Sequence, residues 1–313
     1  MKVTIDQKNY NLKVEEGWKV RHFNWFIDEE ILNLMFKKME IMDILVDRES
    51  KLRTLVVEND REEIITFPYV KRNGERKSIQ EVVQIQDYKW YCKDRHLNIF
   101  VKVCEKYDID VIGINIDTGK KGKPVAKIET DGINRYIKSL DYDISRQMEK
   151  LKKDVMPLIE WKEVDRGTEE WDEWLKLIIS NVMDWNRRYF EELRPESVGI
   201  LLVLSYVKQY VECIVKIGLN ENGKIMMGKM FDDIVGSFIL VEGENTLYSF
   251  LACRNKDFDE FSMGHIMQLR KVEVLLESDK KYLSLGGTLD KYPHKKKWST
   301  EVGETGAVGI GYL

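Results

Sequence analysis

The residues best suited to chemistry lie in the last third of the chain. Gly264, His265 and Ile266 open a segment whose apolar stripe predicts a helix to about residue 280. Because the first turn of a helix has free backbone N–H groups, such a start can bind an anion. A basic, aromatic loop follows at residues 292–298, and its lysines can supply countercharge to a phosphate. Together these features indicate acyl transfer from a phosphate-bearing donor.

The elements around this helix are predicted to form one sheet. A helix from Pro195 is expected to lead to a strand at residues 213–217, and the turn at 220–223 then starts a hairpin. Apolar patterning predicts further strands at residues 237–241, 247–253 and 282–285. The order in this half is therefore antiparallel strands, a helix and a last strand.

The first half is predicted to repeat this order. It starts with a strand pair that turns at residues 15–17 and continues with a helix capped by Asp28. A hairpin follows, and Pro68 is expected to end its second strand because proline has no N–H for the sheet. A helix from Asp94 then leads to a strand at residues 109–114.

The middle of the chain connects the two halves. Residues 117–124 are rich in Gly, Lys and Pro, which predicts a loop near a domain junction. Their spacing does not match a phosphate-binding loop, so we interpret them as a solvated turn. A helix over about 143–158 follows, and Thr168 is expected to cap another. Trp171 and Trp174 on that helix fit a core stripe or the lining of an acyl pocket.

Composition places the chain among folded proteins. Its 313 residues favour two domains, and 43% hydrophobic residues with only 5 Pro argue against disorder. The net charge of −4 gives no overall field for nucleic acid. No apolar run approaches the roughly 20 residues that span a bilayer, which disfavours a membrane segment.

The cysteines indicate a cytoplasmic protein without a metal. None of the four stands in C-x-x-C spacing, and all lie within apolar patterns, which is typical of reduced core thiols. They are Cys92, Cys104, Cys213 and Cys253.

Three short motifs carry a resemblance to a known family: residues 261–265, residues 283–287, and the closing Tyr292, Lys295 and Trp298. Through them the chain resembles the GNAT (N-acetyltransferase-like) superfamily, in the branch related to cellulose-biosynthesis acetyltransferases and Fem-type aminoacyltransferases. One departure is clear. The superfamily's pyrophosphate loop usually reads R/Q-x-x-G-x-G/A, whereas this chain keeps a single glycine there.

The resemblance implies an α/β (α+β) fold of two tandem GNAT-like domains. Each would be a mixed, mostly antiparallel sheet flanked by helices, with a degenerate domain at residues 1–130 and an acyltransferase domain at residues 131–313. The donor, an acyl-CoA or an acyl carrier protein, would lie between the strands at 247–253 and 282–285. The residues expected to bind it are Gly264, His265, Ser284, Gly286, Gly287, Lys295 and Lys296.

In this family an amine attacks the thioester directly, so the protein mainly positions the reactants and moves protons. Tyr292 or Tyr248 is expected to protonate the leaving thiolate, since a phenol has a pKa of about 10. His265 at a helix start would stay neutral and act as a base, and Glu212 is a further candidate base. The same residues also fit structural roles, as partly buried aromatics and helix-start or solvated polar groups.

Three functions remain open. The leading one is an N-acyltransferase that acts on a primary amine of a small molecule or peptide. The second is aminoacyl transfer from charged tRNA, although the coiled-coil arm usual in Fem-type enzymes is not seen in the sequence. The third is a GNAT-fold binding protein that has lost activity, consistent with the single glycine.

Overall fold

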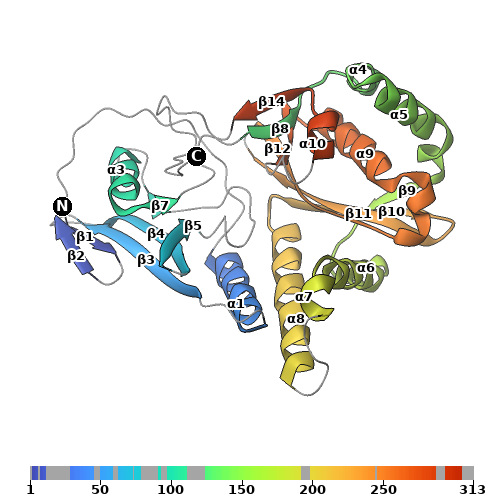
Figure 1. The fold of residues 1–313 in the computed structure, drawn as a ribbon. Helices are drawn as coiled ribbons and strands as arrows, with labels where there is room; N and C mark the ends of the chain where they lie inside the picture. Colours follow the sequence, from blue (N-terminus) through green and yellow to red (C-terminus); the bar gives the residue numbers. More distant parts are fainter. Residues whose placement is uncertain are drawn as a thin grey trace. The chain divides into compact units, whose positions relative to one another are not determined.

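A computed structural model describes residues 2–5, 8–11, 29–45, 50–58, 63–72, 74–78, 91–92, 97–110, 124–191, 198–243, 245–286 and 293–304. The chain packs as two compact units, Met1–Lys123 with Glu304–Leu313, and Pro124–Gly303. Each unit has a sheet and helices of its own (Figure 1).

The first unit is built on a seven-stranded sheet in the order β2-β1-β3-β4-β5-β7, with β6 paired to β4. All its pairs are antiparallel except β5 with β7. Its elements are β1 (Lys2–Ile5), β2 (Lys8–Asn11), α1 (Glu29–Leu45), β3 (Ser50–Glu58), β4 (Glu63–Arg72), β5 (Glu75–Ser78), β6 (Tyr91–Cys92), α3 (Leu97–Tyr107) and β7 (Ile109–Asp110).

Two predictions in this unit were wrong. The first strand pair joins Ile5 to Lys8, so the chain reverses well before residues 15–17. Pro68 does not end its strand but lies in the middle of β4, opposite Thr54 of β3. On its other side β4 pairs with β6 at Ile65 and Thr66 and with β5 from Tyr69 onwards, so Pro68 lies between the segments that pair with these two strands. Residues 15–17, Asp28, Asp94 and 117–123 lie outside the described residues.

The second unit has another seven-stranded sheet, in the order β14-β8-β13-β12-β11-β10-β9. Its strands are β8 (Pro124–Ile128), β9 (Glu160–Glu163), β10 (Gly223–Met230), β11 (Asp233–Glu242), β12 (Thr246–Arg254), β13 (Tyr282–Gly286) and β14 (Glu301–Glu304). Its helices are α4 (Ile133–Lys138), α5 (Tyr142–Asp154), η2 (Met156–Leu158), α6 (Glu170–Trp185), α7 (Arg187–Glu191), α8 (Val198–Gly218), η3 (Lys256–Phe261), α9 (Met263–Glu277) and α10 (Pro293–Trp298).

Helices cover both faces of this second sheet. α9 packs on β11, β12 and β13 with α4 and α5 beside it, whereas α6 and α8 pack together on the opposite face (Figure 1). The core under α9 joins Ile266 and Val272 to Phe238, Leu247 and Leu283 from the strands. The predicted fold class is thus confirmed as mixed α/β, with mostly antiparallel sheets flanked by helices.

The predicted strand at residues 213–217 was wrong, because α8 continues as a helix to Gly218. Cys213, Ile214 and Ile217 are buried at helical spacing, and the Leu219 N–H donates to the Val215 carbonyl. A short apolar run rich in Ile and Val fits either structure in sequence, and packing decides. The turn at 220–223 therefore joins a helix to β10 and is not a hairpin.

Two smaller expectations also changed. Thr168 does not cap α6, because its hydroxyl donates back to the Asp165 carbonyl at 2.9 Å and Glu169 precedes the helix. The basic loop before Trp298 is the short helix α10. The core interpretation of Trp174 is confirmed, since its side chain is fully buried.

Candidate functional site

The central feature of the second unit is a parting of two neighbouring strands. β12 and β13 run parallel and pair only at three positions, the last being Tyr248 with Ser284. β12 then continues to Arg254, and within the described part of the chain no strand pairs with residues 249–254 on that side. A bulge at Phe250, between the pairs that Ser249 and Leu251 make with β11, increases the local twist. We call the region beside residues 249–254 the strand opening.

Helix α9 begins just after β12 and η3 and carries the predicted anion-binding turn. Ser262 precedes it in the left-handed region, with φ of 54°, and its hydroxyl accepts a bond from Gln147 Nε2 at 3.0 Å. The N–H groups of His265 and Ile266 both donate to the Ser262 carbonyl. The first turn therefore offers fewer donors to an anion than its sequence predicts.

α10 lies against this first turn and brings several predicted residues together. The Trp298 ring is 5.3 Å from that of His265 and 4.9 Å from that of His294, centroid to centroid. A Cβ on Gly264 would meet Trp298 at 3.7 Å, an ordinary contact. The Tyr136 hydroxyl donates to the Trp298 carbonyl at 3.0 Å, which ties α10 to α4.

The basic groups around Trp298 have lowered pKa values. Burial lowers the pKa of His265, and His294 adds to the effect. Burial also lowers the pKa of His294, with smaller contributions from Lys295 and Lys271. The pKa of Lys295 falls to about 8, again because of burial. Both imidazoles are therefore neutral at pH 7 and can accept a proton.

Lys271 of α9 is a residue that the sequence interpretation missed. Its side chain is buried, with 6% exposure, and its Nζ donates to Ser249 Oγ of β12 at 2.8 Å. Its pKa is lowered to about 7, mainly by burial and to a smaller extent by the charge of Lys295. A signal was present: Lys271 stands four residues after Met267 and three before Val274, so helical spacing places it on the buried apolar face of α9.

Two further predicted residues, Tyr248 and Ser284, lie on the paired strands β12 and β13. Leu247 and Leu283 face α9, so the alternate residues Tyr248 and Ser284 face the other way. Ser284 is buried, and its Oγ accepts from the N–H of Gly286, which has φ of 79°.

The other candidates lie elsewhere or outside the described residues. Glu212 is on α8, in the helix layer opposite α9, and forms an ion pair with Lys208 at 3.8 Å. Lys296 is exposed on α10. Tyr292 and Gly287 are not among the described residues. The structure thus gathers Gly264, His265 and Lys295 in one place and leaves Glu212 apart.

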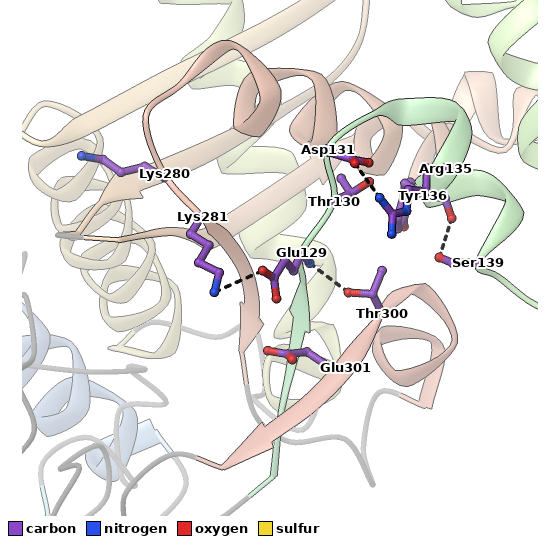
Figure 2. A pocket seen from close by; sticks show the side chains of 10 residues that line it. All are labelled: Glu129, Thr130, Asp131, Arg135, Tyr136, Ser139, Lys280, Lys281, Thr300 and Glu301. Atoms are coloured by element: carbon purple, nitrogen blue, oxygen red, sulfur yellow. Dashed lines mark hydrogen bonds and ion pairs between the residues drawn. The ribbon is translucent and has the colours of Figure 1, made fainter.

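A pocket of about 530 Å³ lies near the start of β13, at the end of this strand away from the opening (Figure 2). Its wall includes an ion pair between Glu129 and Lys281 at 3.2 Å and another between Arg135 and Asp131 at 2.5 Å. Apart from Tyr136, which also bonds Trp298, its lining has no described link to the strand opening. None of the predicted site residues that the structure describes lines it.

Two kinds of feature are missing from the described residues. They contain no group of three or more His, Cys, Asp or Glu that could hold a metal ion. Among these same ranges, no helix has the length and apolar character needed to cross a bilayer.

Comparison with known proteins gave structural likenesses only. No family model and no curated protein matches the chain. A crystal structure of FemX is 10% identical with a TM-score of 0.48, over 93% of this chain and 96% of that one. A tandem GNAT protein from the clavulanic acid biosynthesis pathway is 11% identical with a TM-score of 0.40, over 95% and 99%. L-PGS from Bacillus licheniformis is 9% identical with a TM-score of 0.41, over 85% and 78%. At such identities, and with TM-scores below 0.5, these likenesses carry no argument about the activity of this chain.

Proposed function

We propose that the protein is an N-acyltransferase of tandem GNAT-like architecture. It would move an acyl group from acyl-CoA or an acyl carrier protein to a primary amine of a small molecule or peptide. The observation that carries the proposal is the strand opening: beyond the last pair, Tyr248 with Ser284, no described strand pairs with residues 249–254 of β12 on that side. An extended thioester donor can take the place of the missing strand and bond to its backbone.

The basic cluster beside the opening supports a phosphate-bearing or otherwise anionic donor. Lys295 lies on α10 with Trp298, which packs against His265 at the start of α9. Because His265 is neutral, Lys295 supplies the positive charge there. Lys296 extends the positive charge of α10 into solvent. Such a cluster attracts an anion and orients it, while the opening holds the acyl group.

Proton transfer in the proposed reaction needs a base for the attacking ammonium and an acid for the leaving thiolate. His265 suits the first role, because burial keeps its imidazole neutral. Tyr248 flanks the last strand pair before the opening, but its side chain faces away from α9 and His265, so we do not assign it the second role. Glu212 takes no part in this proposal, since α8 lies on the opposite helix layer from α9.

The test is acyl transfer by the purified full chain. We expect free thiol to appear when acetyl-CoA and a panel of primary amines are supplied, and acyl-CoA to raise the melting temperature. Lys295→Gln is expected to weaken donor binding, whereas Lys297→Gln on the exposed side of the same helix serves as the matched control. A folded protein that neither binds acyl-CoA nor acylates any amine would contradict the proposal and favour an inactive binding protein.

One observation favours a second candidate, aminoacyl transfer from a charged tRNA. Trp298 covers the first turn of α9, where a coenzyme A pyrophosphate would lie, and Ser262 is already bonded to Gln147. A donor that approaches with its acyl end alone would not need that turn. This candidate would be selected by binding of aminoacyl-tRNA that weakens steeply with salt, together with a lack of both binding to and reaction with acyl-CoA.

A further inference from the structure

The contact between Lys271 and Ser249 has the geometry of a nucleophile and its base. The two atoms are 2.8 Å apart, inside the range in which a hydroxyl passes its proton to a neighbouring base. Lys271 is on α9 and Ser249 on β12, one residue beyond the last pair with β13. Lys271 is buried, whereas Ser249 is half-buried.

Within the described residues, the amine of Lys271 has no acidic partner. Its Nζ bonds the Ser249 hydroxyl and lies 5.5 Å from the centre of the Phe238 ring. No carboxylate within the described residues forms an ion pair with it. A buried ammonium without a counter-charge is costly, so the neutral amine is favoured.

The ionisable groups that face Lys271 act in the same direction. Burial and, to a smaller extent, Lys295 on α10 together bring its pKa to about 7. His294 on the same helix is close enough to feel the Lys271 charge. Cys253 on β12 would oppose the shift only as a thiolate, and burial raises the pKa of that thiol. A neutral lysine is the form that can remove a proton from serine.

We propose that Ser249 and Lys271 form a catalytic dyad in which Ser249 accepts an acyl group from an activated ester or thioester. This deepens the proposed acyl transfer by dividing it into two steps, but the dyad itself does not depend on coenzyme A as donor. Serine with a lysine base is an established variant of serine nucleophilic catalysis.

The chemistry balances without a further reagent. The Ser249 Oγ attacks the acyl carbon, a carbon–oxygen bond forms, and the carbon–sulfur or carbon–oxygen bond of the donor breaks. The hydroxyl proton passes to Lys271 Nζ, which becomes an ammonium and delivers it to the leaving thiolate or alkoxide. In the second step an amine or water attacks the acyl ester, and the Ser249 oxygen leaves and regains a proton through Lys271. The products are an amide or a carboxylic acid.

The experiment uses p-nitrophenyl acetate with the intact full chain. We expect a burst of about one equivalent of nitrophenolate, and peptide mass spectrometry that places an acetyl group on Ser249. The acylation rate should fall as the pH drops below about 7, because Lys271 then becomes protonated. Ser249→Ala should abolish the burst and the label.

Two replacements of the base separate its chemistry from its packing. Lys271→Met preserves the length of the side chain and Lys271→Arg preserves the charge, yet neither can accept the proton. Both should slow acylation by about 100-fold or more while the circular dichroism spectrum stays unchanged. Ser249→Cys supplies another nucleophile and should retain a label at residue 249. Ser205→Ala, an exposed serine on α8, is the control and should label normally.

The outcomes distinguish the dyad from the proposed function. Labelling that persists in Ser249→Ala, or that falls on another residue, would overturn the dyad even if amines are acetylated by acetyl-CoA. Labelling of Ser249 by the ester, with no reaction towards acyl-CoA, would support the dyad and remove coenzyme A as donor. A wild-type protein that is folded and shows no burst would also overturn the dyad.

Discussion

Lys271 is the residue whose chemistry changes most when the chain folds. An unfolded lysine has a pKa of about 10.4, and burial between α9 and β12 brings it to about 7. Between these two pKa values, the folded state therefore binds fewer protons at Lys271 than the unfolded state does. Since stability rises with pH wherever the unfolded state binds more protons, Lys271 destabilises the fold most below about pH 7 and least above about pH 10.

We predict that Lys271→Met raises the free energy of unfolding at pH 7. The gain should shrink as the pH rises towards 10, because deprotonation of the unfolded lysine removes the penalty. Urea unfolding at several pH values measures both effects. Lys208→Met, an exposed position on α8, is the control and should show no such dependence on pH. A gain that stays constant with pH would contradict the explanation.

A second prediction concerns the two histidines beside Trp298. Burial is the largest cause of the lowered pKa of both His265 and His294, and the Trp298 ring packs on each. Trp298→Ala should therefore raise both pKa values towards 6.5, as NMR titration of the imidazole protons would measure. Trp185→Ala, at an exposed tryptophan on α6, should leave them unchanged. If the pKa values of both histidines stay unchanged in Trp298→Ala, contacts other than the Trp298 ring must shield them from water.

At the scale of elements, the apolar patterning of the strands and the positions of turn residues predicted most of the second sheet. β11, β12 and β13 and helix α9 were expected within a few residues of their observed bounds. The end of α8 was not, because residues 213–217, apolar except for Lys216, suit a strand as well as a buried helix face. What distinguishes the two is the packing of α8 on α6 and β10, which sequence pattern does not contain.

The turn between α8 and β10 gives a test of this correction. A Cβ on Gly223 would collide with the Ile217 carbonyl and lie 2.7 Å from that of Gly218, both backbone atoms at the helix end. Gly223→Ala should therefore lower the free energy of unfolding by about 1–3 kcal/mol in denaturant titrations. Gly132→Ala is the matched control, since a Cβ added there would meet nothing within 4 Å. It should change stability by less than about 0.5 kcal/mol. Equal changes in the free energy of unfolding for the two variants would contradict the explanation that Gly223 is crowded by the end of α8.

At the scale of the whole molecule, the described candidate site lies within the second unit. That unit has its own sheet and a core that joins α4, α5 and α9 to the strands. We predict that residues 124–304 expressed alone unfold cooperatively and keep the donor affinity of the full chain. Calorimetry and acyl-CoA titration measure the two properties. A fragment that folds but binds more weakly would assign part of the donor site to the first unit.

The sequence by itself determined the mixed fold, the helix start at Gly264 and the basic segment near it. These features follow from the periodicity of apolar residues and from the positions of glycine, proline and lysine, which influence the structure of nearby residues in the chain. It also indicated buried cysteines, and Cys104, Cys213 and Cys253 are buried and free of disulfides. Tertiary structure decided the rest. Lys271 meets Ser249 across 22 residues of chain only when α9 packs on β12, and Glu212 is removed from the site because α8 packs on the opposite face. Such contacts depend on which surfaces bury each other, and no local pattern records that choice.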